Sequence, residues 1–332
     1  MKKKLLMVIF LMAAKITFAQ KVDRVDAIGI TVSDMESALA FYTKVLPFTI
    51  IDQTEVSGES YEHLKGLFGI RYKKVRLRLG EEEIELTDYL TSGGRAIPED
   101  SKSNDLWFQH IAIVVSDMDS AYARLRKHNI LHVSTAPQTL PKTIPAAAGV
   151  KAFYFRDPDG HNLELIYFPE GKGDPRWHTK TNQVFLGIDH TAIGINATRQ
   201  SLQFYDELLG LTRAGDSFNF GVEQEHLNNV FGASLHITGN KGISGPGVEF
   251  LEYLTPKTGR PYPEDSRADD LVHWETVFVT HELDQLFAKL KSTDVKFISP
   301  AIVSIGDEKY LYDRGFYIRD PDGHVVGIFE RR

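Results

Sequence analysis

Beyond residue 20, the chain repeatedly switches between two spacings of its hydrophobic residues. Short alternating runs such as QHIAIVV at 109–115 predict strands, because successive strand side chains point to opposite faces. Each run is followed by a turn and then by apolar residues at helical spacing, as in SDMDSAYARLRKHN at 116–129. About three short strands with turn signals follow each helix. The pattern predicts four βαβββ modules that start near residues 25, 108, 187 and 272.

The four modules form two tandem copies. VDAIGITVSDMESALAFY at 25–42 aligns with IDHTAIGINATRQSLQFY at 188–205, and EHLKGLFG at 62–69 aligns with EHLNNVFG at 225–232, both at an offset of 163 residues. A constant offset over most of the chain indicates homologous halves. We therefore expect one domain at 24–168, a linker at 169–185 and a second domain at 186–332.

One hairpin carries both the repeat and its main difference. FYFRDPDGHNLEL at 153–165 recurs as FYIRDPDGHVVGI at 316–328, but Glu164 of the first copy is Gly327 in the second. Asp-Pro-Asp-Gly favours a tight turn between two strands. For His161 and His324, which follow the turn, we favour a structural role over a ligand role.

The N-terminus has the pattern of a secretory signal peptide. Three lysines at 2–4 precede an apolar stretch at 5–14, and Thr17 and Ala19 are small residues suited to a cleavage site. The apolar stretch is too short to span a bilayer, which disfavours a membrane anchor. With no cysteine in the chain, neither a lipid-anchored cysteine nor a disulfide can form. We expect residues 1–19 to be removed and the protein to be exported, to a bacterial periplasm, without remaining in the membrane.

Composition narrows the class of partner. The formal net charge is −7, and removal of the four lysines of the signal peptide would make it −11. An acidic chain without a basic cluster argues against binding to nucleic acid. The hydrophobic fraction of 42% is enough for a sizeable core. A small molecule is therefore the expected partner. The oligomeric state is left open, with a monomer as one outcome.

Four such modules resemble the vicinal oxygen chelate superfamily, which has the fold of glyoxalases, bleomycin-resistance proteins and extradiol dioxygenases. The resemblance rests on the strand starts with Asp-His or Asp-Ala, the Phe-Tyr pairs on the helices, Ile-Glu or Val-Glu on the fourth strands, and the two RDPDGH turns. It implies an α+β fold in which paired modules form two curled sheets. It also implies that each module offers one metal-ligand position on its first strand and one on its fourth.

These ligand positions fall on eight residues of this chain, two from each module in order: Ala27 and Glu85, His110 and Glu164, His190 and Glu249, Glu275 and Gly327. Pairing neighbouring modules would give two incomplete sets. Pairing module two with three, and one with four, would bring together His110, Glu164, His190 and Glu249, which is the ligand set of glyoxalases. Linker lengths permit both pairings. We favour the crossed pairing, because it places both losses, Ala27 and Gly327, in one discarded site.

The resemblance implies a metal-dependent lyase or isomerase that acts on a small hydroxy-carbonyl substrate through an enediolate. Glu164 and Glu249 are the candidate catalytic carboxylates, and the metal would be a divalent ion of zinc, nickel, cobalt, iron or manganese. No organic cofactor is expected. The alternative is a metal-free protein that binds and sequesters a small molecule, as bleomycin-resistance proteins do. An extradiol dioxygenase is disfavoured, because neither half has the His, His, Glu triad of that class.

Overall fold

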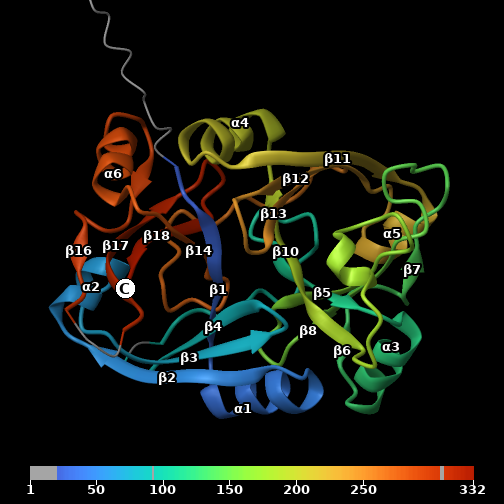
Figure 1. The fold of residues 1–332 in the computed structure, drawn as a ribbon, viewed down its shortest axis with the longest axis horizontal. Coiled ribbons are helices and arrows are strands. Elements are labelled where there is room, and N and C mark those ends of the chain that lie inside the picture. Colours follow the sequence, from blue (N-terminus) through green and yellow to red (C-terminus); the bar gives the residue numbers. More distant parts are fainter. Residues whose placement is uncertain (1–20, 92, 307–309) are drawn as a thin grey trace, which may run out of the picture.

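The computed structural model describes residues 21–91, 93–306 and 310–332. The predicted signal peptide, residues 1–19, lies outside the described residues. Among the helices of the described part, none is long and apolar enough to cross a membrane. The fold is mixed α+β, with two large curled sheets side by side and helices on their outer faces (Figure 1).

The structure contains the four predicted modules. The elements of module one are β1 (Arg24–Val32), α1 (Met35–Ala40), η1 (Phe41–Val45), β2 (Thr49–Ser57), α2 (Glu59–Lys65), β3 (Arg71–Leu79) and β4 (Glu82–Tyr89). Those of module two are β5 (Gln109–Val115), α3 (Met118–Lys127), β6 (Leu131–His132), β7 (Gln138–Thr139), β8 (Lys151–Arg156) and β9 (Asn162–Tyr167). The short 3-10 helix η2 (Pro175–His178) lies between the sequence halves.

The second half repeats this order. The elements of module three are β10 (Phe185–Ile195), α4 (Thr198–Leu202), η3 (Gln203–Leu208), β11 (Thr212–Phe220), α5 (Val222–Asn228), β12 (Ser234–Lys241) and β13 (Gly247–Thr255). Those of module four are β14 (Trp274–Val279), α6 (Leu283–Lys291), β15 (Lys296–Phe297), β16 (Val303–Ser304), β17 (Tyr312–Arg319) and β18 (Val325–Arg331).

The sheets pair modules across the sequence halves. Sheet A has the strand order β15-β17-β18-β14-β1-β4-β3-β2, so it joins modules four and one. Sheet B has the order β11-β12-β13-β10-β5-β9-β8-β6, so it joins modules three and two. The central contacts are antiparallel, with β1 against β14 and β5 against β10. This is the crossed pairing. Neither sequence half, 24–168 or 186–332, forms a sheet of its own.

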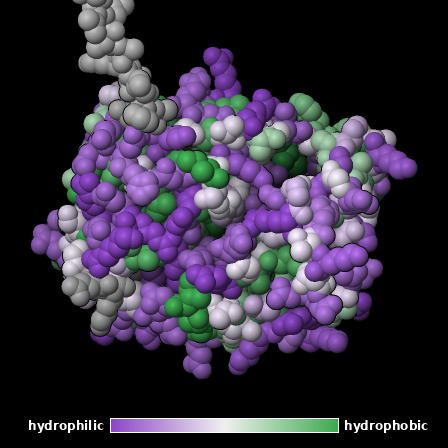
Figure 2. Space-filling view, in the orientation of Figure 1, coloured by the Kyte–Doolittle hydropathy of each residue, from purple (hydrophilic) through white to green (hydrophobic). Residues whose placement is uncertain are grey.

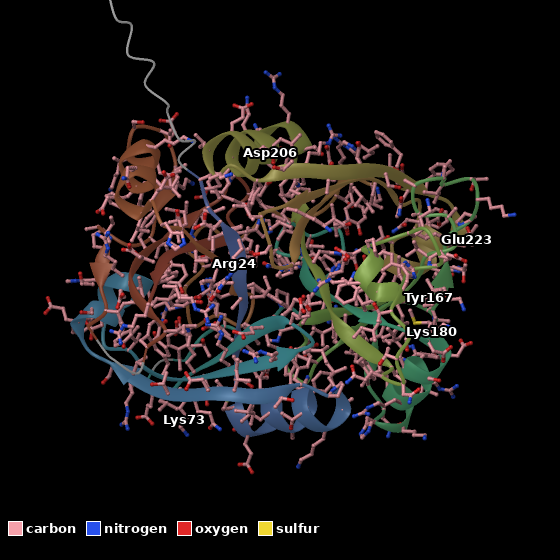
Figure 3. All side chains as sticks on the ribbon, in the orientation of Figure 1. Arg24, Lys73, Tyr167, Lys180, Asp206 and Glu223 are labelled. Carbon is pink, nitrogen blue, oxygen red and sulfur yellow. The ribbon has the colours of Figure 1, made fainter. Side chains whose placement is uncertain are left out.

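Apolar residues divide between the two faces of each sheet. One large buried cluster lies on the helix side and includes residues of both sheets, for example Ile28, Ile111 and Ile193. Smaller clusters line the concave faces, with a tyrosine-rich one in sheet A. Alternation along one strand is visible on β3, where Lys73 is exposed and points outward in Figure 3 while Lys74 is buried. The face of the molecule seen in Figure 2 is largely hydrophilic.

The repeated RDPDGH turns join modules that are distant in sequence. Asp157 accepts a hydrogen bond from the hydroxyl of Tyr42, 3.1 Å away on η1, and lies 2.8 Å from Nδ1 of His161. Nε2 of His161 in turn lies 2.8 Å from the backbone carbonyl of Leu271. In the second copy, Tyr205 bonds to Asp320 in the same way, at 3.2 Å. These contacts support the structural role expected for His161.

Candidate metal centre

The register of sheet B places the four predicted ligand residues around two alanines. On the antiparallel pair β5–β10, His110 lies opposite Ala192, and His190 lies opposite Ala112. On the outer sides, Glu164 of β9 is the partner of Ala112, and Glu249 of β13 is the partner of Ala192. Since paired residues of neighbouring strands project from the same face, all four side chains point to the concave face. The alanines leave the space between them open.

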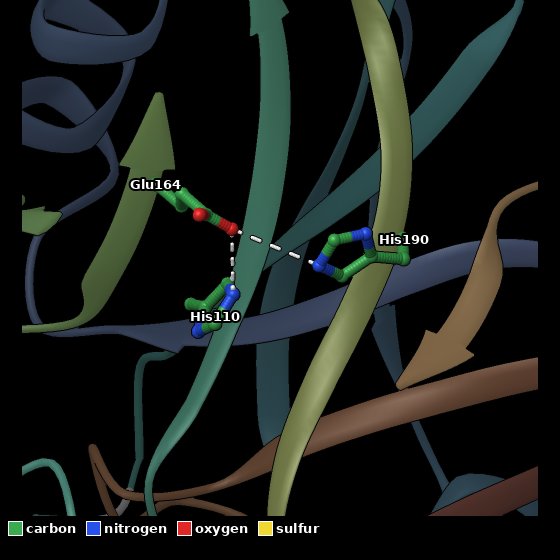
Figure 4. Close-up of side chains that lie close together, drawn as sticks. All are labelled: His110, Glu164 and His190. Atoms are coloured by element: carbon green, nitrogen blue, oxygen red, sulfur yellow. Dashed lines mark hydrogen bonds and ion pairs between the residues drawn. The ribbon is translucent and has the colours of Figure 1, made fainter. Parts of the chain in front are cut away.

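Three of the four side chains meet closely (Figure 4). One ligand atom each from His110, Glu164 and His190 lies within 4.8 Å of the other two, and all three residues are buried. Nε2 of His110 is 3.0 Å from Oε2 of Glu164, and Nε2 of His190 is 3.7 Å from that oxygen. Glu249 approaches from the other side, with its Oε2 3.4 Å from Nε2 of His190. Its side chain is 25% exposed, so Glu249 forms the open rim of the cluster.

A second layer of contacts orients His190. Nδ1 of His190 lies 3.0 Å from Oδ2 of Asp189, so the Nδ1–H donates to that carboxylate. The other oxygen of Asp189 accepts a hydrogen bond from the indole of Trp177, at 2.8 Å. A carboxylate that holds one imidazole nitrogen fixes the ring and turns the other nitrogen toward the site, as in many metal centres.

The electrostatics of the cluster call for a positive charge. Burial lowers the pKa of His190, but the carboxylates of Glu249, Asp189 and Glu164 outweigh it and raise that pKa to about 9. Burial raises the pKa of Glu249 to about 7, with the charges of Glu164 and Asp189 acting in the same direction against His190. The pKa of His110 is lowered, mainly by burial. Several carboxylates around one buried point are costly unless a cation neutralises them.

The residues present fit a divalent metal ion. Two imidazoles and two carboxylates are the donor set that zinc and similar ions take in proteins. Within the described residues, Nε2 of His190 is buried without a hydrogen-bond partner, although it faces two carboxylates. An unpaired buried nitrogen in that position is expected of a metal ligand. His110, Glu164 and His190 would hold the ion, with Glu249 at the open side.

Sheet A carries the corresponding positions without their histidines. The register places Gly29 between Glu275 and Glu85, while Ala27 lies opposite Val277. Both carboxylates are neutralised from within the protein. Lys74 donates to Glu85 at 2.6 Å, and Lys65, which comes from α2, forms a buried ion pair with Glu275. Lys65 and His273 hold the pKa of Glu275 well below its usual range despite burial.

The missing carboxylate of module four has a steric explanation. A Cβ added at Gly327 would lie 2.6 Å from Cε1 of Tyr317 and 2.7 Å from Cε2 of Phe329. Tyr317 has a counterpart beside Glu164 in sheet B, Tyr154, so the ring that differs is that of Phe329, which stands where sheet B has Ile166. Further along sheet A, Tyr72 and Arg76 are buried at the positions where the repeat in sheet B has Leu235 and Gly239. Large side chains therefore crowd this part of the concave face of sheet A, where the repeat in sheet B has a leucine and a glycine.

Two supporting contacts of the site could not be derived from the sequence. Asp189 directly precedes His190, and the Asp-His pair at the strand start was the available signal for it. Trp177 comes from η2, and only the fold shows that it reaches Asp189. A separate chain of amides links Asn219 of β11 to Gln224 and Asn228 of α5, and Nδ2 of Asn228 is buried without a partner in the described part of the chain. Arg95 and Arg260 form ion pairs with Asp270 and Asp105.

The comparisons with known proteins agree with this architecture. The model of the Glyoxalase/Bleomycin resistance protein/Dioxygenase superfamily matches residues 24–165 and again 187–328. The chain therefore belongs to this superfamily, in a tandem arrangement.

Relatives named in these comparisons cover one or both halves. A 2-epi-5-epi-valiolone epimerase from an Actinomyces species is 30% identical over 151 residues, which are 43% of this chain and 79% of that protein. Glyoxalase I from Zea mays superposes with a TM-score of 0.61 at 14% identity and covers 93% of this chain and 92% of its own. A putative dioxygenase from Bacillus subtilis gives a TM-score of 0.58 at 14% identity, over 94% of this chain and 86% of its own. At these identities, the solved structures show the shared fold.

Proposed function

We propose that the protein is a metal-dependent isomerase or lyase that acts on a small hydroxy-carbonyl compound. The observation that carries the proposal is the convergence of His110, Glu164 and His190, from both sequence halves, on one buried point of sheet B. A divalent ion held there would polarise a substrate carbonyl and acidify the neighbouring C–H group. The likeness to an epimerase over one half of the chain favours an isomerase within this pair.

The chain's own residues supply the proton transfer. A carboxylate of Glu164 or Glu249 takes the proton from the carbon next to the carbonyl. The C–H electron pair forms a carbon–carbon double bond while the π pair of the carbonyl moves onto its oxygen, which gives an enediolate. Return of a proton to the opposite face, or to the neighbouring carbon, completes an epimerisation or an isomerisation. Glu249 suits this role because its side chain is partly exposed, on the open side of the cluster. His190, whose ring is fixed by Asp189, lies between both carboxylates.

The test combines metal content with proton exchange. Purified protein that has never met a chelator is assayed for bound metal. The same protein in D₂O is then given dihydroxyacetone or a polyhydroxylated cyclohexanone, and deuterium uptake beside the carbonyl is followed by NMR. We expect about one metal per chain and uptake that disappears in Glu249→Gln. Bound ketone without exchange would instead support a protein that only sequesters its ligand.

Histidine variants test whether one centre is responsible. His110→Ala and His190→Ala are each expected to remove the same metal equivalent, and the double variant to lose no more than either single one, because their effects are coupled at one centre. The matched control is His226→Ala, since His226 is exposed on α5 near the same sheet. Separate, additive losses from His110→Ala and His190→Ala would contradict the proposal.

A further inference from the structure

Sheet A, which lacks the histidines of the predicted metal centre, borders a small polar cavity. It has a volume of about 210 Å³ and lies at the concave side of sheet A, where Lys65, His273, Glu275, Tyr317 and Arg319 form part of its wall. Gly66 and Arg267, also in the wall, are exposed and mark its mouth. Ligand pockets for drug-sized molecules are larger, so a cavity of this size suits a small metabolite.

Comparison with the other repeat shows that this cavity has gained polar groups. In sheet B, the hydroxyl of Ser101 accepts a hydrogen bond from the indole of Trp107, at 2.7 Å. In sheet A, the repeat has Ser266 for Ser101 and Val272 for Trp107, and the hydroxyl of Ser266 is buried without a partner among the described residues. The next position is also changed, from Phe108 to His273.

His273 presents a hydrogen-bond acceptor. It is buried in the wall, with its Nε2 2.9 Å from Oε1 of Glu275, so the Nε2–H donates to that carboxylate. Burial lowers the pKa of His273, which keeps the imidazole neutral and leaves Nδ1 as a bare acceptor. This Nδ1 is buried and unpartnered within residues 21–91, 93–306 and 310–332. A ligand hydroxyl could donate to it.

Among the charged side chains that line the cavity, one cation has no carboxylate partner. Lys65 is paired with Glu275, and Arg267 is paired with Asp269 at 2.7 Å. The guanidinium of Arg319 donates only to the carbonyls of Gly323 and Ser266, and no carboxylate of the described residues forms an ion pair with it. One uncompensated cation matches a ligand with one negative charge. Ala268, Ile298 and Val325 add apolar wall for a short carbon skeleton.

We infer that this cavity is a second ligand site, which binds a small hydroxy-monocarboxylate between Arg319, Ser266 and His273. The carboxylate pairs with the guanidinium of Arg319 and accepts from the hydroxyl of Ser266. The ligand's own hydroxyl donates to Nδ1 of His273. The site lies on the other sheet from the proposed metal centre and does not depend on it.

The probe is L-lactate, with propionate as the analogue that lacks the hydroxyl and inorganic phosphate as the competing oxyanion. Binding is measured by calorimetry and by ligand-observed NMR on the full chain. Because hydroxy acids also chelate metals, the measurement is repeated on the His110→Ala/His190→Ala double variant, where lactate should bind as in the wild type. Propionate should bind about fivefold more weakly than lactate, which is the effect of one lost hydrogen bond.

Variants of the wall decide the outcome. Ser266→Ala removes only a hydroxyl and should weaken lactate about fivefold, and Arg319→Gln should weaken it by more than about tenfold. The matched controls are Ser101→Ala and Arg156→Gln at the same repeat positions of sheet B, where Arg156 donates to the carbonyl of Ser101 as Arg319 does to Ser266. These controls should leave the affinity unchanged. The inference is overturned if lactate does not bind, if phosphate binds more tightly, or if binding disappears only with the two histidines.

Discussion

Asp189 and Asp26 occupy the same position of the repeat, but they serve different purposes. Asp189 orients His190. Asp26 is instead buried in an ion-pair network with Arg76 and Arg331 and accepts from the hydroxyl of Tyr312. The residue beside it is Ala27, which offers no imidazole, and the aspartate pairs with cations instead. The pair therefore offers two variants that are alike in sequence context and opposite in expected effect.

For Asp189→Asn we expect weaker metal binding. The amide can no longer accept the Nδ1–H of His190 as a charged partner, so the ring loses its fixed orientation. Loss of such a supporting contact typically reduces metal affinity about 10- to 100-fold. A competition titration against a chelator measures the change, and Asp26→Asn is the control. Equal metal affinity in the wild type and Asp189→Asn would show that Asp189 does not support the centre.

For Asp26→Asn we expect a lower free energy of unfolding at neutral pH and a weaker dependence of that free energy on pH below about 4. Burial raises the pKa of Asp26, but Arg76, Arg24 and Tyr312 outweigh it and lower that pKa from 3.8 to about 2. The ionised carboxylate thus contributes about 2 kcal/mol above pH 4, and this contribution is lost as the pH falls from about 4 to 2. Urea unfolding at pH 7 and pH 2 measures it. The wild type and the variant should differ at pH 7 and converge at pH 2.

At the scale of elements, the hairpin β17–β18 shows how a ligand position is closed. Gly327 admits the rings of Tyr317 and Phe329, so Gly327→Ala should overpack the concave face of sheet A. We expect a loss of about 1–3 kcal/mol in the free energy of unfolding, measured by urea titration. Gly93→Ala is the control, because no atom lies within 4 Å of its added Cβ. A neutral Gly327→Ala would mean that the rings can move aside.

The elements also show where sequence reasoning reaches its limit. Strand alternation was enough to place His110 and His190 on the same face as small residues, because the two-residue period of a strand is local. The constant offset was enough to identify Gly327 as the repeat position equivalent to Glu164. The pairing of Lys65 with Glu275 could not be predicted, since α2 and β14 meet only through the order of strands in sheet A. The change from Phe108 to His273 was visible when the two repeats were aligned, but its consequence is clear only from the cavity that His273 lines.

At the scale of the whole molecule, the cellular location of the protein stays a prediction. The basic and apolar N-terminal segment, followed by small residues, leads us to propose export with cleavage after Ala19. Protein isolated from its natural host should then begin at Gln20, and intact mass and N-terminal sequencing of each cell fraction measure this. A soluble cytoplasmic form that retains Met1 would contradict it.

The crossed pairing also limits when each sheet can be completed during synthesis of the chain. Sheet B is built from one continuous stretch of chain between β5 and β13. Sheet A joins β1 to β14, so Arg24 can pair with Val279 only after most of the chain has been made. Because the chain is synthesised from its N-terminus, modules two and three can pair before module four has been made. The proposed metal centre is then complete while β1 still presents an open edge. Module one is made first, but the free edge of β1 is covered only after β14 of module four has been made.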